Sequence, residues 1–328
     1  MMTFATGCLP SMDLRGVGIG RRTRITSILS ILDESAQKWG ISFNFKLFIG
    51  GSTARNACCM KGDKMYNKNE LTEQLRQMGL HGNETILIHS SMKAIGQVDG
   101  GADTVLDVWS EFFVEGLLLL PTHTWKNVNN ENPIYDPVST PSCVGLLTNM
   151  FMKREGVVRS LHATHSMAGL GQNAAEYLRG EEFCNTPCTP GGCYDRLKDC
   201  CGKILLVGVG HERNTYIHSV EEVLNVPNRL SDKPMELIIV MPDGERRKVY
   251  VRKHYNASQP HISEDFVKLN QAFLECGAAK KVKFGDADCL LCDARKIFEV
   301  IRHVLAPDPE CIVTSEYIAP ERWKDITF

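Results

Sequence analysis

The pattern of hydrophobic and polar positions divides the chain into two parts. Residues 1–64 show little periodicity, whereas apolar residues recur at regular spacing over residues 65–328. The glycine-rich stretch 16–20 follows no predicted strand, so it does not qualify as a dinucleotide-binding loop. We therefore expect a poorly ordered N-terminal extension over residues 1–64, dispensable for the fold, and one folded domain over residues 65–328.

Within residues 65–328, segments with helical and strand periodicity alternate. Leu71, Leu75 and Met78 share one helical face, which predicts an amphipathic helix that ends at Gly79. Apolar runs and periodic segments further along the chain predict strands and helices in turn. The predicted strands cover 84–91, 116–125, 202–210 and the segment around Cys289–Cys292, and the predicted helices cover 100–113, 142–154, 214–226, 263–277 and 293–305.

This alternation predicts the fold class. Strands that alternate with helices indicate a layered α/β/α domain, and a hairpin predicted over 235–253 around Asp243–Gly244 makes its β-sheet mixed. Ligands of such sheets bind beyond the carboxyl ends of the strands. Three predicted strands end in polar or reactive residues, at 89–91, 122–124 and 208–214, and these ends form the expected site floor.

Composition excludes several classes of protein. A hydrophobic content of 43%, a charged content of 23% and a net charge of -2 over 328 residues are typical of a globular protein and give no basic surface for nucleic acid. No apolar run approaches the ~20 residues that span a bilayer, so no membrane partner is expected. The N-terminus lacks the pattern of a secretory signal, and we expect a cytoplasmic location.

The thirteen cysteines are an odd number in a long chain, which favours reduced thiols. Five of them crowd one segment, but their irregular spacing fits zinc knuckles poorly, and we expect no metal ion. A thiol-based metal protein built on this segment is the weaker alternative. The five are Cys184, Cys188, Cys193, Cys200 and Cys201.

Candidate chemistry gathers on the predicted helix 214–226. His218 and Glu221 are three residues apart and share a face, and Thr215 lies on the same stripe. A carboxylate in that place can fix the tautomer of the imidazole and favour a role as general base. The spacing alone equally suits a structural histidine–carboxylate pair, and Glu222 competes with Glu221 for the imidazole.

A second pair, His162 and His165, occurs among small residues in the segment 159–171. The chain carries no H-x-x-x-H motif with a helical glutamate, no G-x-S-x-G elbow and no phosphate-binding P-loop. A zinc protease and a serine hydrolase are therefore poor interpretations.

An ordered set of seven motifs resembles the aminoglycoside 3-N-acetyltransferases, also called antibiotic N-acetyltransferases. The resemblance covers about residues 66–305, and no single motif decides it. The motifs are IHSSMKAIGQVDGGADTVLD (88–107), LPTHTW (120–125), YDPVSTPSCVG (135–145), VVRSLHATHSMAGLG (157–171), NTPCTPGGCYDRL (185–197), LLVGVGHERNTYIHSVEEVLNVP (205–227) and GDADCLLCDAR (285–295).

The resemblance implies direct transfer of an acetyl group from acetyl-CoA to a small-molecule amine, without a covalent acyl-enzyme. In the family's N-T-x-x-H-x-x-E motif the histidine is the general base, which matches His218. The acidic partner matches Glu221 and the threonine matches Thr215. The R-S-x-H-P-x-x-S motif matches His162, with Ala163 in place of the proline.

The resemblance also implies where the substrates bind. CoA is expected at the strand end His89, Ser90 and Ser91, with its phosphates at the helix start Gly100–Gly101. Three residues are expected at the amine site: Asp136, Glu131 and His165.

Two departures from the family leave alternatives open. The loop 125–137 is rich in asparagine and keeps only two carboxylates, so the acceptor can be an amine other than an aminoglycoside. Residues 1–64 have no counterpart in the family. A non-catalytic acyl-CoA-binding protein and a ping-pong enzyme that uses Cys143 are the rival functions. The sequence does not fix the oligomeric state, and a homodimer is one state that it allows.

Overall fold

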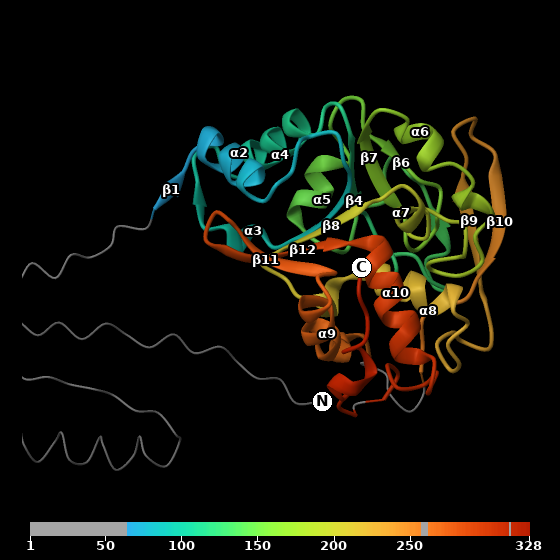
Figure 1. Cartoon of the computed structure of the whole chain (residues 1–328). Coiled ribbons are helices and arrows are strands. Elements are labelled where there is room, and N and C mark those ends of the chain that lie inside the picture. The colour runs from blue at the N-terminus through green and yellow to red at the C-terminus, as the bar shows by residue number, and fades with distance from the viewer. Residues whose placement is uncertain (1–63, 257–261, 315) are drawn as a thin grey trace, which may run out of the picture. The chain divides into compact units, whose positions relative to one another are not determined.

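A seven-stranded mixed β-sheet forms the centre of the computed structural model, which describes residues 64–256, 262–314 and 316–328 (Figure 1). The extension expected over residues 1–64 lies, apart from Lys64, outside the described residues. In spatial order the strands are β11 (Ala279–Phe284), β12 (Ala287–Asp293), β8 (Lys203–Val207), β2 (Thr85–Ser90), β4 (Leu117–Pro121), β7 (Met167–Gly171) and β6 (Val158–Arg159).

The middle of this sheet is parallel and its flanks are antiparallel. Strand β2 runs parallel to both of its neighbours, β4 and β8, and every other pair in the sheet is antiparallel. Central strands covered on both faces need apolar side chains on both faces, and all five residues of β4 are buried. The predicted mixed sheet is therefore confirmed.

Helices cover both faces of the sheet, which confirms the α/β/α layers (Figure 1). Alternate residues of β2 point to opposite faces: Ile86 and Ile88 belong to one apolar core and Leu87 to the other. The helices over the first core are α2 (Lys68–Gln77), α3 (Met92–Ile95), α4 (Gly101–Phe112) and α5 (Leu146–Phe151). Those over the second are α6 (Ala174–Tyr177), α7 (Arg196–Asp199), α8 (Thr215–Val223), α9 (Asn270–Glu275) and α10 (Ala294–Leu305).

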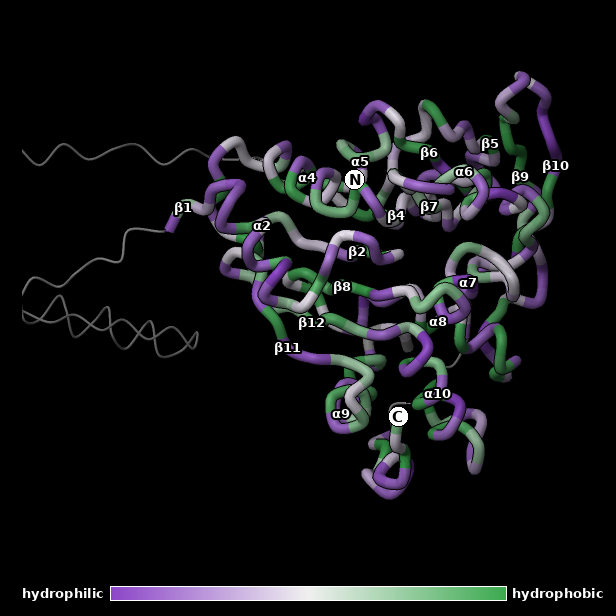
Figure 2. The backbone as a smooth tube through the Cα atoms, turned by 45° about the horizontal axis from the view of Figure 1, so that its top comes forward, coloured by the Kyte–Doolittle hydropathy of each residue, from purple (hydrophilic) through white to green (hydrophobic). Residues whose placement is uncertain are grey.

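Local sequence explains where the best-defined helices begin. The side chain of Asn67 accepts a hydrogen bond from the Glu70 N–H, and Glu70 in turn accepts one from the Asn67 N–H, which is a capping box. The Asp293 carboxylate caps α10 in the same way, by accepting from the Lys296 N–H at 3.0 Å. In the tube of Figure 2, the interior strand β8 is largely coloured as hydrophobic.

The predicted hairpin is present but lies in a second sheet. Strands β9 (Met235–Val240) and β10 (Arg246–Val251) pair in antiparallel register, and β5 (Ile134–Tyr135) adds a parallel edge. The hairpin does not join the main sheet because its inward side chains, among them Leu237 and Val251, bury a small core of their own. The main sheet is mixed because of β6, β7, β11 and β12. A further parallel pair joins β1 (Met65–Tyr66) to β3 (Gln97–Val98).

Two predicted helices differ from the structure. The helix expected over 142–154 is only α5, because Gly145 adopts a φ of 130° and the side chain of Asn149 bonds the Ser142 backbone instead of continuing a helix. The helix expected over 263–277 begins as the 3-10 helix η3 (Ile262–Leu269) and becomes α-helical at α9. The other 3-10 turns are η1 (Glu181–Phe183), η2 (His211–Arg213) and η4 (Pro320–Arg322).

The topology positions the candidate site. Strands β8, β2 and β4 are neighbours, and β2 is parallel to the other two, so their carboxyl ends share one edge of the sheet. The predicted grouping of the three polar strand ends is confirmed. Among the described residues no helix is long and apolar enough to cross a bilayer.

Candidate active site

His218 lies in the middle of α8 and is hydrogen bonded on both ring nitrogens. Its Nδ1 lies 2.8 Å from Oε2 of Glu221, and its Nε2 lies 3.1 Å from Oγ of Ser263. Glu221, and not Glu222, is therefore the carboxylate that faces this imidazole. A carboxylate accepts hydrogen bonds, so Nδ1 carries the proton and Nε2 presents its lone pair.

Arg229 completes this pair from beyond the helix. Its Nε donates to Oε1 of Glu221 at 2.7 Å, and its side chain is only 3% exposed. After α8 ends, Asn225 and Asn228 adopt left-handed φ values of 52° and 58°, which turn the chain back so that Arg229 reaches the helix. Asparagine tolerates this conformation better than most residues.

Burial dominates the electrostatics of this pair. Burial, with a smaller contribution from the Arg229 guanidinium, lowers the pKa of His218 to about 3. Burial also raises the pKa of the Glu221 carboxyl above its usual value, and Arg229 offsets part of that change. At neutral pH the imidazole is uncharged, which is the state that can accept a proton.

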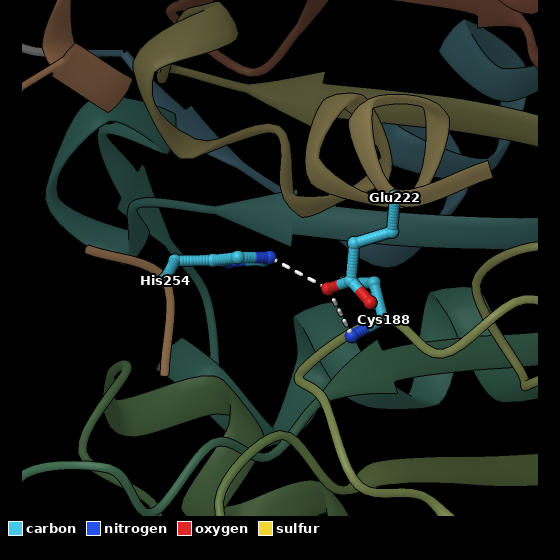
Figure 3. Close-up of side chains that lie close together, drawn as sticks. All are labelled: Cys188, Glu222 and His254. Atoms are coloured by element: carbon cyan, nitrogen blue, oxygen red, sulfur yellow. Dashed lines mark hydrogen bonds and ion pairs between the residues drawn. The ribbon is translucent and has the colours of Figure 1, made fainter. Parts of the chain in front are cut away.

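A second histidine–carboxylate pair lies beside the first (Figure 3). Nε2 of His254 lies 2.7 Å from Oε1 of Glu222, and the same oxygen accepts the Cys188 N–H at 2.9 Å. The Thr186 hydroxyl donates to the other oxygen of Glu222. The rings of His254 and His218 stack with their centroids 4.1 Å apart, so the two pairs share one buried site.

Two more histidines extend this group to a buried cluster. The ring of His165 lies 6.0 Å from that of His254 and 4.7 Å from that of His123. His123 lies two residues after β4, and its Nε2 is 2.6 Å from the Tyr194 hydroxyl. Burial lowers the pKa of both His123 and His165 well below the usual histidine value, so they too remain neutral.

His162, expected in the catalytic set, has both ring nitrogens engaged by the backbone. Nδ1 accepts from the N–H groups of Thr164 and His165 at 3.2 Å and 3.0 Å. Nε2 must then carry the proton, which it donates to the Thr186 carbonyl at 2.9 Å. Since no lone pair is left free, His162 holds the loop around Thr186 and is not placed to move a proton.

Thr215 is the first residue of α8 and is buried. Its carbonyl lies 3.8 Å from the Cys188 thiol. The neighbouring Asn214 does not cap α8 with its side chain, because its amide instead lies 3.2 Å from Nδ1 of His211.

The residues expected at the CoA site fall into two places. Ser90 and Ser91 line a cavity of about 260 Å³, together with Met92 and the segment 144–148. His89 is buried one residue earlier on β2, and burial lowers its pKa to about 3. Gly100 and Gly101 start α4 with φ values of 74° and 63°, but neither lines that cavity.

The residues expected at the amine site are also separated. The Asp136 carboxylate accepts from the Ser139 hydroxyl at 2.6 Å and from the Val138 N–H, so it closes its own turn. Glu131 is exposed in the loop before it. A neighbouring cavity of about 640 Å³ is lined by four cationic side chains and suits a cationic amine poorly. They are Lys153, Arg154, Arg159 and Arg179.

Comparison with known proteins identifies the family. The model of the family described as aminoglycoside 3-N-acetyltransferase matches residues 87–306, about two thirds of the chain. The chain belongs to the aminoglycoside 3-N-acetyltransferase family. It is thus an acyltransferase by descent, and the matched region contains α8 and both histidine–carboxylate pairs.

Curated members of the family match over most of their length. Aminoglycoside N(3)-acetyltransferase VII of Streptomyces paromomycinus is 28% identical over 272 residues, covering 74% of this chain and 92% of that protein. Aminoglycoside N(3)-acetyltransferase IV of a Salmonella species is 26% identical over 247 residues, covering 74% and 89%. The similarity to these acetyltransferases therefore extends over about three quarters of this chain.

Solved structures show the same fold. The apoenzyme of aminoglycoside acetyltransferase AAC(3)-IVa aligns with a TM-score of 0.64 at 23% identity, over 79% of this chain and 94% of that one. AAC-IIIb, solved as a binary complex with CoASH, aligns with a TM-score of 0.63 at 19% identity, over 72% and 94%. At these identities the likeness establishes the architecture.

Two residues of the candidate site were not predicted from the sequence. Arg229 and His254 lie outside α8 and carry no local motif that links them to it. The paired Glu221 and Glu222 were the available signal for two partners, because neighbouring helical residues point in different directions and only one can face His218. Asn225 and Asn228, which precede Arg229, indicate a tight turn of the chain.

Proposed function

We propose that this acetyltransferase moves an acetyl group from acetyl-CoA directly to the 3-amino group of an aminoglycoside, with His218 as general base. The observation that carries the proposal is the buried contact of 2.8 Å between His218 Nδ1 and Glu221, which leaves Nε2 as the nitrogen that accepts. In the free site this nitrogen contacts the Ser263 hydroxyl, which a substrate amine would replace. The names of the curated relatives support the acceptor, and the CoASH complex of AAC-IIIb supports the donor.

The chemistry needs a base that is neutral at working pH. The amine nitrogen attacks the thioester carbonyl, and the nitrogen becomes strongly acidic as its new bond forms. His218 Nε2 then accepts that proton, the C–S bond breaks, and the CoA thiolate leaves. Burial lowers the pKa of His218, so the imidazole is better suited to take the proton from the attacking amine than from a free ammonium ion.

Glu221 and Arg229 have positioning functions in this scheme. Glu221 holds the proton on Nδ1 and stabilises the imidazolium when it forms, and Arg229 fixes the carboxylate. Ser263 marks the approach of the acceptor, because its hydroxyl lies 3.1 Å from the nitrogen that takes the proton. Thr215, at the start of the same helix, remains the expected donor to the developing oxyanion.

The pantetheine arm of CoA is proposed to enter at the cavity beside Ser90 and Ser91, at the same sheet edge as the end of β8. His89, the buried residue before Ser90 on β2, is proposed to support that strand end. Gly100–Gly101 remain the proposed phosphate contact. Residues 65–328 are proposed to carry the activity in the cytoplasm. The ten cysteines of the described residues are all free thiols, as a reducing compartment would keep them.

The acceptor could instead be a less cationic amine. Asp136 uses its carboxylate in its own turn, and Glu131 is the other carboxylate of the asparagine-rich loop. Aminoglycosides carry several positive charges, which such a loop attracts weakly. His165, in the buried cluster, is the third residue proposed to meet the acceptor.

Release of CoA from acetyl-CoA tests the proposal directly. Wild type, His218→Ala and a control, His303→Ala, are assayed with aminoglycosides and with simpler amines, using a thiol reagent corrected for the protein's own cysteines. His303 is exposed on α10, so its variant should match wild type. Loss of a positioned base is expected to lower kcat by ~10²–10⁴-fold.

Four outcomes decide between the candidates. Turnover of an aminoglycoside that is lost in His218→Ala supports the proposal. Turnover of another amine alone keeps the mechanism and replaces the acceptor. Acetyl-CoA binding with no turnover of any acceptor favours the non-catalytic acyl-CoA-binding alternative, and unchanged turnover in His218→Ala contradicts the base.

A further inference from the structure

Three metal-ligating side chains converge next to His218 from distant parts of the chain. Cys188 comes from the loop after η1, Glu222 from α8 and His254 from the segment after β10 (Figure 3). Their donor atoms all lie within 4.8 Å of one another. Among the described residues this is the one group of histidine, cysteine and carboxylate donors with such spacing.

The charges around this group are unbalanced. The Glu222 carboxylate is 3% exposed, and its partners are the His254 imidazole, the Thr186 hydroxyl and the Cys188 N–H. These partners include no arginine or lysine. Arg229, the nearby cation, is engaged by Glu221.

We propose that Cys188, Glu222 and His254 bind one Zn²⁺ ion. A thiolate, a carboxylate and an imidazole are the ligand types that zinc takes in proteins, and three protein ligands leave a fourth position for water or another ligand. Zinc–ligand bonds of ~2.0–2.3 Å place neighbouring donors roughly 3–4 Å apart, so the side chains need to shift by about 1 Å.

The protons balance simply. The proton that now links His254 Nε2 to Glu222 moves to Nδ1 when Nε2 ligates the ion, and the Cys188 thiol releases its proton to solvent. The ion thereby adds two positive charges against a carboxylate and a thiolate, which neutralises the buried anion. Of the five crowded cysteines, only Cys188 belongs to this donor group. The other two ligands come from distant parts of the chain, so the irregular spacing of the cysteines does not prevent metal binding.

Second contacts would hold the ligands in place. His162 donates to the Thr186 carbonyl, and the Thr186 hydroxyl donates to Glu222, so the carboxylate is oriented from behind. The ring of His254 stacks on that of His218 at 4.1 Å. An ion would fix the ring of His254 and therefore the packing of His218 against that ring. Metal binding itself does not depend on the proposed acetyl transfer.

Metal content and cobalt spectra test this site independently of activity. The full-length protein is purified without chelator, its zinc is measured by elemental analysis, and the stripped protein is titrated with Co²⁺. We expect one zinc per chain and an intense sulfur-to-cobalt charge-transfer band in the near ultraviolet. Cys188→Ser should abolish the band, and Glu222→Gln should weaken Co²⁺ binding by more than ~100-fold, since even outer contacts cost 10–100-fold.

A matched cysteine gives the control. Cys184, four residues earlier, lies near Glu181 and outside the donor group, so Cys184→Ser should keep both the zinc and the band. Thermal unfolding verifies that each variant is folded, and Glu222→Gln decides the matter if Cys188→Ser is not. Wild type without zinc and without a cobalt band, or a band that persists in Cys188→Ser, would overturn the proposal.

Discussion

Two neighbouring residues of α8 make the same contact in different electrostatic settings. Glu221 and Glu222 each bond one imidazole, at 2.8 Å and 2.7 Å, and the two rings stack on each other. Glu221 has a cationic partner in Arg229, whereas Glu222 is held by uncharged donors. One helix turn thus supplies a charge-balanced pair suited to proton transfer and an anionic pair suited to a cation.

Removal of the Arg229 guanidinium should have the largest effect on the difference between the Glu221 and Glu222 pairs. Arg229→Met leaves Glu221 buried without its guanidinium, and breaking a buried ion pair costs about 3–5 kcal/mol of unfolding free energy. Urea unfolding measures the loss. Arg302→Met, whose ion pair with Glu299 on α10 is exposed, should change stability by less than about 1 kcal/mol. Equal losses in the two variants would contradict the special status of the Glu221 pair.

His211 provides a reference for buried histidines outside both pairs. Burial lowers its pKa to about 4, so the unfolded chain takes up the proton first as the pH falls. The resulting stability is fully present above pH 6.5 and is lost as the pH falls towards 4, by about 3 kcal/mol. His211→Gln should flatten the stability–pH curve by that amount in urea unfolding at pH 7, 5.5 and 4. A curve parallel to wild type would refute this.

Glu221→Gln probes the function of the first carboxylate without changing its size. An amide can donate to Nδ1 and so favour the wrong tautomer, with the proton on Nε2. We expect kcat to fall about 10²-fold, near the lower end of what a positioned base contributes, while the affinity for acetyl-CoA stays unchanged. Steady-state CoA release and equilibrium binding measure the two quantities. A weakened affinity with normal kcat would show that Glu221 serves binding instead.

Ser263→Ala should have the smallest effect. Its hydroxyl contacts Nε2 of His218 at 3.1 Å in the free site, where the acceptor amine is proposed to arrive. Removal of one modest hydrogen bond of ~0.5–1.5 kcal/mol should change kcat by less than about tenfold and leave the unfolding free energy nearly unchanged. A loss as large as that in His218→Ala would make Ser263 a catalytic residue, not a marker of the approach.

The fold was largely predictable because its central signals are local. The apolar run of β4 and the capping box at Asn67 predict their elements from a few neighbouring residues. The antiparallel strands β6 and β7 escaped prediction, because β7 is the sequence MAGLG and lacks branched or aromatic residues. The separate sheet of the hairpin also escaped, since the sequence shows that β9 and β10 pair but not which core they cover.

For the site, the sequence by itself determined the family, the helix that carries His218 and the spacing that lets a carboxylate meet it. Those properties depend on residues within one helical turn. Only the tertiary structure decided that Glu221 is the partner, that Arg229 balances it, and that His254 forms a second pair. The physical reason is that charge balance and burial depend on groups far apart in the chain, and only packing brings these groups within a hydrogen bond of α8.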